Sequence, residues 1–111
     1  LEIELTESVL QTGPATVEAL RQLRALGVSI ALDDFGTGYS SLASLEQLPL
    51  SRVKLDRSLI STIDTSERSF AIAHAIIELC RGLGLDVTAE GIERPAQFAL
   101  LARERDVTLQ G

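Results

Sequence analysis

Acidic side chains recur at the ends of strand-like runs in this sequence. Asp33 and Asp34 are adjacent at one such end, and Glu4 and Glu90 lie at two others. If these groups converge, their like charges raise one another's pKa or recruit cations. Oxygen ligands favour hard ions such as Mg²⁺ or Mn²⁺, and adjacent aspartates can bridge two ions about 4 Å apart for phosphate ester hydrolysis. The alternative for the aspartate pair is turn and cap chemistry.

Lys54 is the only lysine among the 10 basic residues. Side chains alternate along a strand, so Lys54 and Asp56 share one face while Val53 and Leu55 share the other. If the apolar pair packs on helices, we expect Lys54 and Asp56 to point toward the centre of a barrel. One alternative is an interior salt bridge that only fills space. Another is a Schiff base on Lys54, which nearby carboxylates disfavour because they keep the amine protonated.

The elements that must position these groups follow an alternating pattern. Apolar or β-branched runs predict strands at residues 1–6, 28–32, 52–55, 85–89 and 107–109. Helical periodicity predicts helices from Pro14 to the cap at Gly27, over 41–48, from the cap at Ser66 to Gly82, and over 95–103. We expect Leu26 on the inward stripe of the first helix, and Phe98, Leu101 and Ala102 inward on the last.

This alternation predicts an α/β fold with a parallel sheet and crossover helices. An open doubly wound sheet and part of a TIM-type (β/α) barrel both fit. In either fold, ligand sites form at the carboxyl ends of the strands. The Phe35–Gly36–Thr37–Gly38 loop there permits close approach to a ligand, although a plain turn is the alternative. It matches neither a P-loop nor a dinucleotide fingerprint.

Composition sets the limits of the interpretation. A chain of 111 residues, 45% apolar and 23% charged, suits one globular domain. A net charge of −6 excludes a general nucleic-acid binder, and one cysteine excludes an internal disulfide. Since no apolar run approaches about 20 residues, we expect no membrane contact. The sequence contains no methionine, and we interpret it as a segment of a longer protein.

Five segments carry a resemblance to a known family. They are ELTES (4–8), DDFGTGYSSL (33–42), VKLDRSLI (53–60), AEGIE (89–93) and LQG (109–111). In this order and spacing they resemble successive motifs of the EAL domain family, bacterial phosphodiesterases that linearise cyclic di-GMP. The resemblance implies that residues 1–111 form roughly the second half of a TIM-type barrel. The name-giving Glu-Ala-Leu strand, a metal-binding asparagine and a last segment then lie outside it.

Carried over residue by residue, the resemblance implies metal ligands at Glu4, Asp33, Asp34 and Glu90. Asp33 matches the carboxylate that bridges two metals, and Asp34 matches a ligand of the second. Glu90 matches the glutamate that helps to hold the second metal or its water. Lys54 matches the lysine near the attacking water and the scissile phosphate. Whether Lys54 or Glu90 handles the proton of the water stays open.

Further matches imply supporting roles. Gln110 matches a glutamine that touches the active-site network and completes a catalytic set with Lys54 and Glu90. Glu7 matches the glutamate that anchors the DDFGTG loop, which the family links to metal binding and dimerisation. Asp56 and Glu93 match motif positions with supporting roles. The AEGIE motif is followed by Arg94-Pro95, where the family more often has threonine and an acidic residue. We expect that difference to affect local packing only.

The implied activity is hydrolysis of cyclic di-GMP to linear pGpG with two divalent ions, Mg²⁺ or Mn²⁺. The resemblance also implies a homodimer and a cytoplasmic location, with a parent protein that is membrane-tethered in some members. The alternative is a degenerate EAL domain that acts as a cyclic di-GMP receptor or a protein-interaction module. Because part of a barrel leaves open sheet edges, we expect residues 1–111 alone to fold poorly or self-associate, with negligible turnover.

Overall fold

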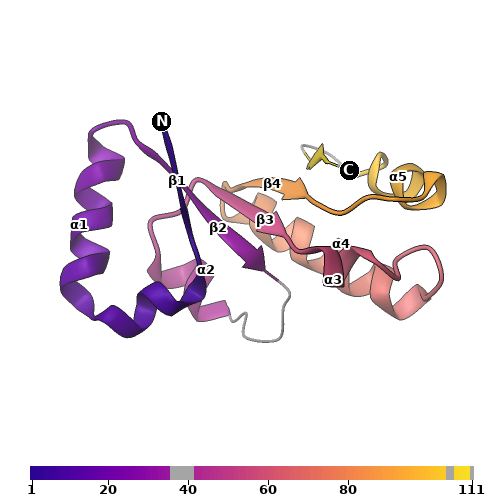
Figure 1. The fold of residues 1–111 in the computed structure, drawn as a ribbon, viewed down its shortest axis with the longest axis horizontal. Helices are drawn as coiled ribbons and strands as arrows, with labels where there is room; N and C mark the ends of the chain where they lie inside the picture. The colour runs from indigo at the N-terminus through magenta and orange to yellow at the C-terminus, as the bar shows by residue number, and fades with distance from the viewer. Residues whose placement is uncertain (36–41, 105–106, 111) are drawn as a thin grey trace.

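The computed structural model describes residues 1–35, 42–104 and 107–110, and Figure 1 shows a central sheet whose strands alternate with helices. The strands are β1 (Glu2–Leu5), β2 (Ser29–Phe35), β3 (Arg52–Leu55), β4 (Asp86–Ala89) and β5 (Val107–Leu109). The helices are η1 (Glu7–Thr12, 3₁₀), α1 (Pro14–Ala25), α2 (Leu42–Gln47), α3 (Arg57–Ile60), α4 (Glu67–Gly82) and α5 (Pro95–Leu101). None of the helices described is long and apolar enough to cross a membrane.

All neighbouring strands are parallel, and their order in the sheet follows the chain, β1-β2-β3-β4-β5. A doubly wound sheet reverses its strand order at a switch point, whereas a barrel wall adds each strand beside the last. The observed order therefore favours the (β/α) barrel over the open doubly wound sheet.

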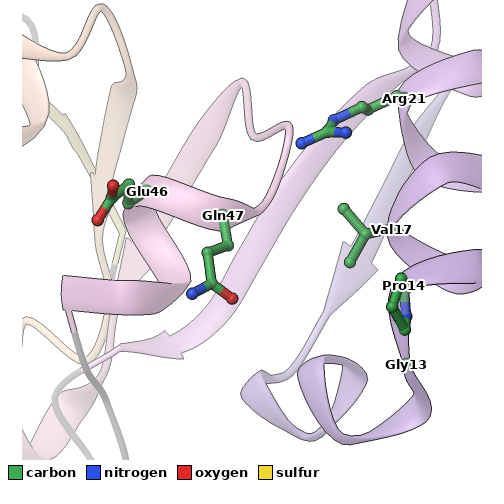
Figure 2. A pocket seen from close by; sticks show the side chains of 6 residues that line it. All are labelled: Gly13, Pro14, Val17, Arg21, Glu46 and Gln47. Atoms are coloured by element: carbon green, nitrogen blue, oxygen red, sulfur yellow. The ribbon is translucent and has the colours of Figure 1, made fainter.

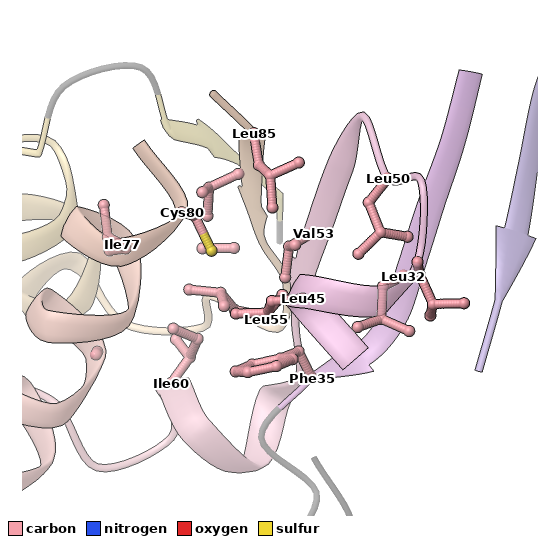
Figure 3. Close-up of a cluster of buried hydrophobic side chains, with 14 of the residues drawn as sticks. Leu32, Phe35, Leu45, Leu50, Val53, Leu55, Ile60, Ile77, Cys80 and Leu85 are labelled. Atoms are coloured by element: carbon pink, nitrogen blue, oxygen red, sulfur yellow. The ribbon is translucent and has the colours of Figure 1, made fainter. Parts of the chain in front are cut away.

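The outer face of the sheet carries the apolar core (Figure 3). Its fully buried strand residues are Ile30, Leu32, Val53, Leu55, Val87 and Ala89. They pack against Leu20 of α1 and against Ile77 and Cys80 of α4. Full burial of each large aliphatic side chain is worth about 1.5–3 kcal/mol. Because side chains alternate, the polar residues of the same strands are turned to the opposite, inner face.

The structure confirms the predicted strands and the four predicted helices, with differences at their ends. The second strand extends to Phe35, and the last helix ends at Leu101. The short helices η1 and α3 were not predicted. The cap at Ser66 is confirmed, since its side chain accepts a 3.2 Å hydrogen bond from the Ser69 amide at the start of α4.

Three predicted inward positions are wrong. Leu26 is 80% exposed because α1 ends at Ala25, which leaves Leu26 outside the helical stripe. Phe98 is 53% exposed and Ala102 is also exposed, whereas Leu101 is 1% exposed. The other inward residue of α5 is Gln97, one turn before Leu101. The polar residue Gln97 is therefore buried where the apolar periodicity predicted Phe98.

Candidate active site

Asp33 and Asp34 lie in a β-bulge at the end of β2. Together they oppose the single residue Lys54 of β3, because the strand register shifts between Leu32 and Phe35. Asp34 has a positive φ of 58°, a conformation that aspartate adopts more readily than most residues. Its amide donates a 2.9 Å hydrogen bond to the Asp33 carboxylate. Because of the bulge, two successive aspartates lie opposite one residue of β3. In a regular strand each aspartate would pair with a different residue.

Lys54 links β1 to the end of β4 across the inner face. Its Nζ donates a hydrogen bond to the Glu4 carboxylate and lies 3.9 Å from Oε1 of Glu90. The hydrogen bond to Glu4 raises the pKa of Lys54, and the charges of Glu90 and Asp33 add to this effect while burial opposes it. The side chain is 15% exposed. Lys54 is therefore a largely shielded ammonium held between two carboxylates.

Glu90 follows β4 and is fixed to the sheet by its backbone. Its amide donates a 3.1 Å hydrogen bond to the Leu55 carbonyl at the end of β3. Burial raises the pKa of the Glu90 carboxyl, and the charge of Asp33 raises it further, whereas Lys54 lowers it. Glu90 therefore lies within the electrostatic reach of both the bulge and the lysine.

Asp56 connects the bulge to helix α3. It is the N-cap of α3, and its carboxylate accepts a 2.9 Å hydrogen bond from the Ser58 amide, which lowers the pKa of Asp56. Burial raises the pKa of Asp34, and the charges of Asp33 and Asp56 raise it further. The predicted supporting residue Asp56 therefore acts on Asp34 while it caps a helix.

Gln110 and a second polar layer lie beside Lys54. A hollow of about 250 Å³ is lined by Glu2, Arg52, Lys54, Thr88, Thr108 and Gln110. The backbone of Gln110 bonds to β4 and the segment after it, donating to the Ala89 carbonyl at 2.9 Å and accepting from the Ile92 amide at 3.1 Å. Arg52 lies 3.5 Å from the Glu2 carboxylate and donates to Thr88 at 2.8 Å. The inner face is thus polar below the carboxylate cluster as well.

The two remaining predicted positions are Glu7 and Glu93. Glu7 is the first residue of η1; its side chain and residues 36–38 of the DDFGTG loop lie outside the described part of the chain. Glu93 forms an ion pair with Arg57 of α3 at 3.5 Å, with both side chains more than half exposed. The structure therefore brings Glu93 to α3 and leaves the predicted contact between Glu7 and the loop undescribed.

Sequence reasoning missed Gln97 as a residue near the site. Gln97 is 1% exposed, and its Oε1 accepts hydrogen bonds from the amides of Glu93 at 2.8 Å and Arg94 at 2.9 Å. A glutamine at the third position of a helix that reaches back to the cap residue is half of a capping box. The signal was present in the sequence, but arginine at the cap position concealed it, because the motif ordinarily begins with serine or threonine.

The carboxylates at the strand ends offer the oxygen donors that divalent metal ions bind. Glu4, Asp33, Asp34 and Glu90 act on one another electrostatically, and Lys54 offsets their repulsion only in part. Divalent cations relieve such repulsion, and an oxygen-only donor set suits Mg²⁺ or Mn²⁺. The donor chemistry is therefore compatible with the metal ligands that the sequence predicted.

Other candidate features lie outside this cluster. A hollow of about 440 Å³ between α1 and α2 is lined by Gly13, Pro14, Val17, Arg21, Glu46 and Gln47 (Figure 2). Its arginine pairs with Glu18 on its own helix. Donor atoms of His74 and Glu78 on α4 and of Glu104, which follows α5, lie within 4.8 Å of one another. His74 already bonds to Glu104 at 2.5 Å, and Glu78 bonds to Arg81 at 2.7 Å. We assign this cluster to ion pairs.

A parallel sheet in chain order, with acidic groups and a lysine at the carboxyl ends of its strands, places the chain in the class of (β/α)-barrel proteins with a charged site at that end. The comparisons with known proteins then give the family. The EAL domain model matches residues 1–111, and the chain belongs to the EAL domain family, whose members have the TIM-barrel fold.

Relatives and solved structures agree with this assignment. The chain is 49% identical over 112 residues to the cyclic di-GMP phosphodiesterase NbdA of Pseudomonas aeruginosa. The match covers the whole chain, which spans 14% of the length of NbdA. A structure of PaMucR phosphodiesterase in complex with c-di-GMP matches 99% of this chain and 45% of its own, at 43% identity and a TM-score of 0.85.

A second structure adds a metal. The Klebsiella pneumoniae BlrP1 manganese/cy-diGMP complex matches 99% of this chain and 28% of its own, with 33% identity and a TM-score of 0.87. A further BlrP1 complex contains calcium and cy-diGMP, with the same identity and coverage. Members of this family have therefore been solved with divalent metals and a cyclic dinucleotide.

Proposed function

We propose that this chain forms part of a cyclic di-GMP phosphodiesterase that hydrolyses its substrate to linear pGpG. The observation that carries the proposal is the arrangement of Glu4, Asp33 and Glu90 around Lys54 at the strand ends. The names of NbdA and of the PaMucR complex support the substrate. The carboxylates alone would repel a phosphodiester, so the proposal includes cations that reverse the sign of the site.

Glu4, Asp33, Asp34 and Glu90 would hold two divalent ions, Mg²⁺ or Mn²⁺, with Asp33 as the shared ligand. Such ions polarise a phosphoryl oxygen and lower the pKa of an attacking water. The bulge supports the shared role, because it presents two aspartates opposite one residue of β3. The BlrP1 complex with manganese supports the choice of a divalent ion.

Lys54 supplies the positive charge that the chain itself brings to the reaction. An ammonium fixed by Glu4 and close to Glu90 is placed to stabilise negative charge that develops on the phosphate. The same contacts oppose the Schiff-base alternative, because the hydrogen bond to Glu4 raises the pKa of Lys54 and a Schiff base requires the neutral amine. Gln110 lines the hollow beside Lys54 and is proposed to contact the same network.

The remaining roles are proposed from the resemblance. Glu7 anchors the DDFGTG loop, and Asp56 and Glu93 support the segments after β3 and β4. The active form is a homodimer, and its location is the cytoplasm, where the messenger is found. Sedimentation of the full-length chain tests the dimer, and cell fractionation tests the location.

The proposed activity is tested with the full-length chain that carries this sequence. It is incubated with cyclic di-GMP and Mg²⁺ or Mn²⁺, beside Asp33→Asn and the matched control Asp86→Asn. Asp86 starts β4 at the far end of the strand from Glu90, and its side chain is 69% exposed. The proposal expects metal-dependent pGpG from the wild type and the control, and none from Asp33→Asn. Binding without turnover in the wild type would favour the receptor alternative.

A further inference from the structure

Gln97 joins three segments of the chain through one buried side chain. Its Oε1 accepts from the amides of Glu93 and Arg94, at 2.8 and 2.9 Å. Its Nε2 donates to the carbonyls of Ile60 and Ser61, each at 3.3 Å. Only 1% of Gln97 is exposed, so its side-chain amide bonds to these backbone groups instead of to water. A single amide therefore ties the end of α3 to the segment before α5.

The joined segments are the ones that leave the site. Helix α3 begins at its cap Asp56, directly after the strand that carries Lys54. Residues 90–94 leave β4 with Glu90 as their first member. The Glu90 amide bonds to the Leu55 carbonyl, so the segment is fixed to the sheet at its start and by Gln97 three residues later. The position of Glu90 relative to Lys54 thus depends on these two attachments and on the bond from the Ile92 amide to the Gln110 carbonyl between them.

Arg94 and Gly91 make further contacts at the same junction. Arg94 donates to Asp64 from Nε at 2.8 Å and from an Nη at 2.6 Å, and also bonds to the Ser61 carbonyl. The Asp64 side chain is only 8% exposed. On the side of the strands, Gly91 packs so closely on Arg57 that a Cβ at Gly91 would lie 2.7 Å from the Arg57 Cβ. The junction between α3 and residues 90–94 is therefore closely packed beyond the contacts of Gln97 itself.

We propose that Gln97 is a positioning residue that sets the separation of the Glu90 carboxylate from Lys54. It holds residues 93 and 94 against the end of α3, and it thereby fixes the backbone that carries Glu90. This inference rests on the proposed function, since it assigns Gln97 to the same metal-dependent site. Residues that orient metal ligands from behind typically change metal affinity or activity by about 10–100-fold when they are replaced.

The test compares Gln97→Leu with two other variants of the full-length chain. Gln97→Glu keeps an oxygen for the two amides, as in an ordinary capping box, but it lacks the Nε2 donor that bonds to the Ile60 and Ser61 carbonyls. Ile77→Ala removes fully buried core volume from α4 and controls for general destabilisation. The readouts are Mn²⁺ affinity by calorimetric titration without substrate, then kcat and KM for cyclic di-GMP, on samples shown to be folded by circular dichroism.

We expect Gln97→Leu to weaken Mn²⁺ binding and to lower kcat by about tenfold or more, with a smaller change in KM. Gln97→Glu, which keeps the contacts to the two amides but loses those to α3, should show part of both losses, whereas Ile77→Ala should lower only the melting temperature. Wild-type Mn²⁺ affinity in Gln97→Leu would overturn the inference. If Gln97→Leu fails to fold, Gln97→Glu and Ile77→Ala decide. The inference is also overturned if these two variants have the same Mn²⁺ affinity and kcat, reduced only in step with their loss of stability. If the wild type binds Mn²⁺ but hydrolyses nothing, the proposed function fails, while Mn²⁺ affinity still decides the role of Gln97.

Discussion

The amide of Asp34 donates a 2.9 Å hydrogen bond to the carboxylate of Asp33, its immediate neighbour in the bulge of β2. This contact orients the Asp33 side chain and accompanies the positive φ of Asp34. Asparagine tolerates the same backbone conformation, whereas a β-branched side chain does not. Substitutions at position 34 can therefore change the carboxylate charge and the backbone strain separately.

We expect Asp34→Asn to leave the free energy of unfolding within about 0.5 kcal/mol of the wild type in metal-free buffer. Because it removes one carboxylate charge, it should weaken Mn²⁺ binding at least about tenfold, which corresponds to about 1.4 kcal/mol. Asp34→Val should instead lose about 1–2 kcal/mol of stability from backbone strain. Urea unfolding and Mn²⁺ titration measure the two effects. Unchanged Mn²⁺ affinity in Asp34→Asn would remove Asp34 from the proposed ligands.

Replacement of Lys54 tests the electrostatic part of the proposal. Lys54→Met keeps most of the side-chain length but leaves Glu4 and Glu90 without the ammonium between them. We expect kcat to fall by about 10²–10³-fold, the usual cost of losing one preorganised donor in an active site. Steady-state kinetics with cyclic di-GMP and Mn²⁺ measure this loss. A variant with wild-type kcat would show that Lys54 only fills the inner face.

Two glycines give a matched test of the junction after β4. Gly91 has a φ of +79° and lies against Arg57, so Gly91→Ala should cost at least about 1–2 kcal/mol. Gly82 ends α4 without a positive φ and has open space where a Cβ would be placed. Gly82→Ala should be neutral or stabilising, by up to about 1 kcal/mol. Thermal unfolding compares them, and equal melting temperatures would contradict the close packing described for Gly91.

Much of the site was predictable because it depends on local patterns. Alternation within β3 placed Lys54 opposite to the buried residues Val53 and Leu55, and the structure has this arrangement. The period of α4 likewise accounts for Cys80, which is buried on the same face as Ala73 and Ile77. These inferences needed only the pleat of a strand or the period of a helix.

The features that were missed depend on contacts between distant segments. The bulge at Asp33 and Asp34 arises from pairing with β3, which a sequence pattern does not reveal. Gln97 is buried because backbone groups from α3 and residues 93–94 meet around it. Apolar periodicity favoured Phe98 for that position. In a helix as short as α5, satisfying buried backbone groups outweighs the burial of one more aromatic ring.

The ion pair between His74 and Glu104 predicts a pH dependence of stability. The contact with Glu104 raises the pKa of His74, with Glu78 adding to the effect while burial and Arg81 oppose it. When folding raises the pKa of a group, the group stabilises the native state fully at a pH below its pKa in the unfolded chain. For histidine this pKa is about 6.5. That stabilisation is lost as the pH rises through the higher folded pKa.

The melting temperature of the wild type should therefore exceed that of His74→Gln most clearly below about pH 6.5. The difference should shrink as the pH rises past the raised pKa of His74. A series of thermal scans from about pH 5.5 to pH 9 measures both chains. A difference that stays constant across this range would show that the imidazolium contributes nothing through Glu104.

The edges of the described sheet predict the behaviour of residues 1–111 when they are expressed alone. Within the described part of the chain, β1 pairs only with β2, and β5 pairs only with β4. Each edge presents unpaired backbone groups, and edge strands of this kind recruit further strands. The inner face adds polar groups such as Lys54 and Arg52, which in a closed barrel would be shielded from bulk water. We expect the isolated segment to sediment as a mixture of oligomers and to show negligible turnover. A monomer with sharp cooperative unfolding by urea would contradict this prediction, and would show that five strands of the barrel wall are stable without the rest.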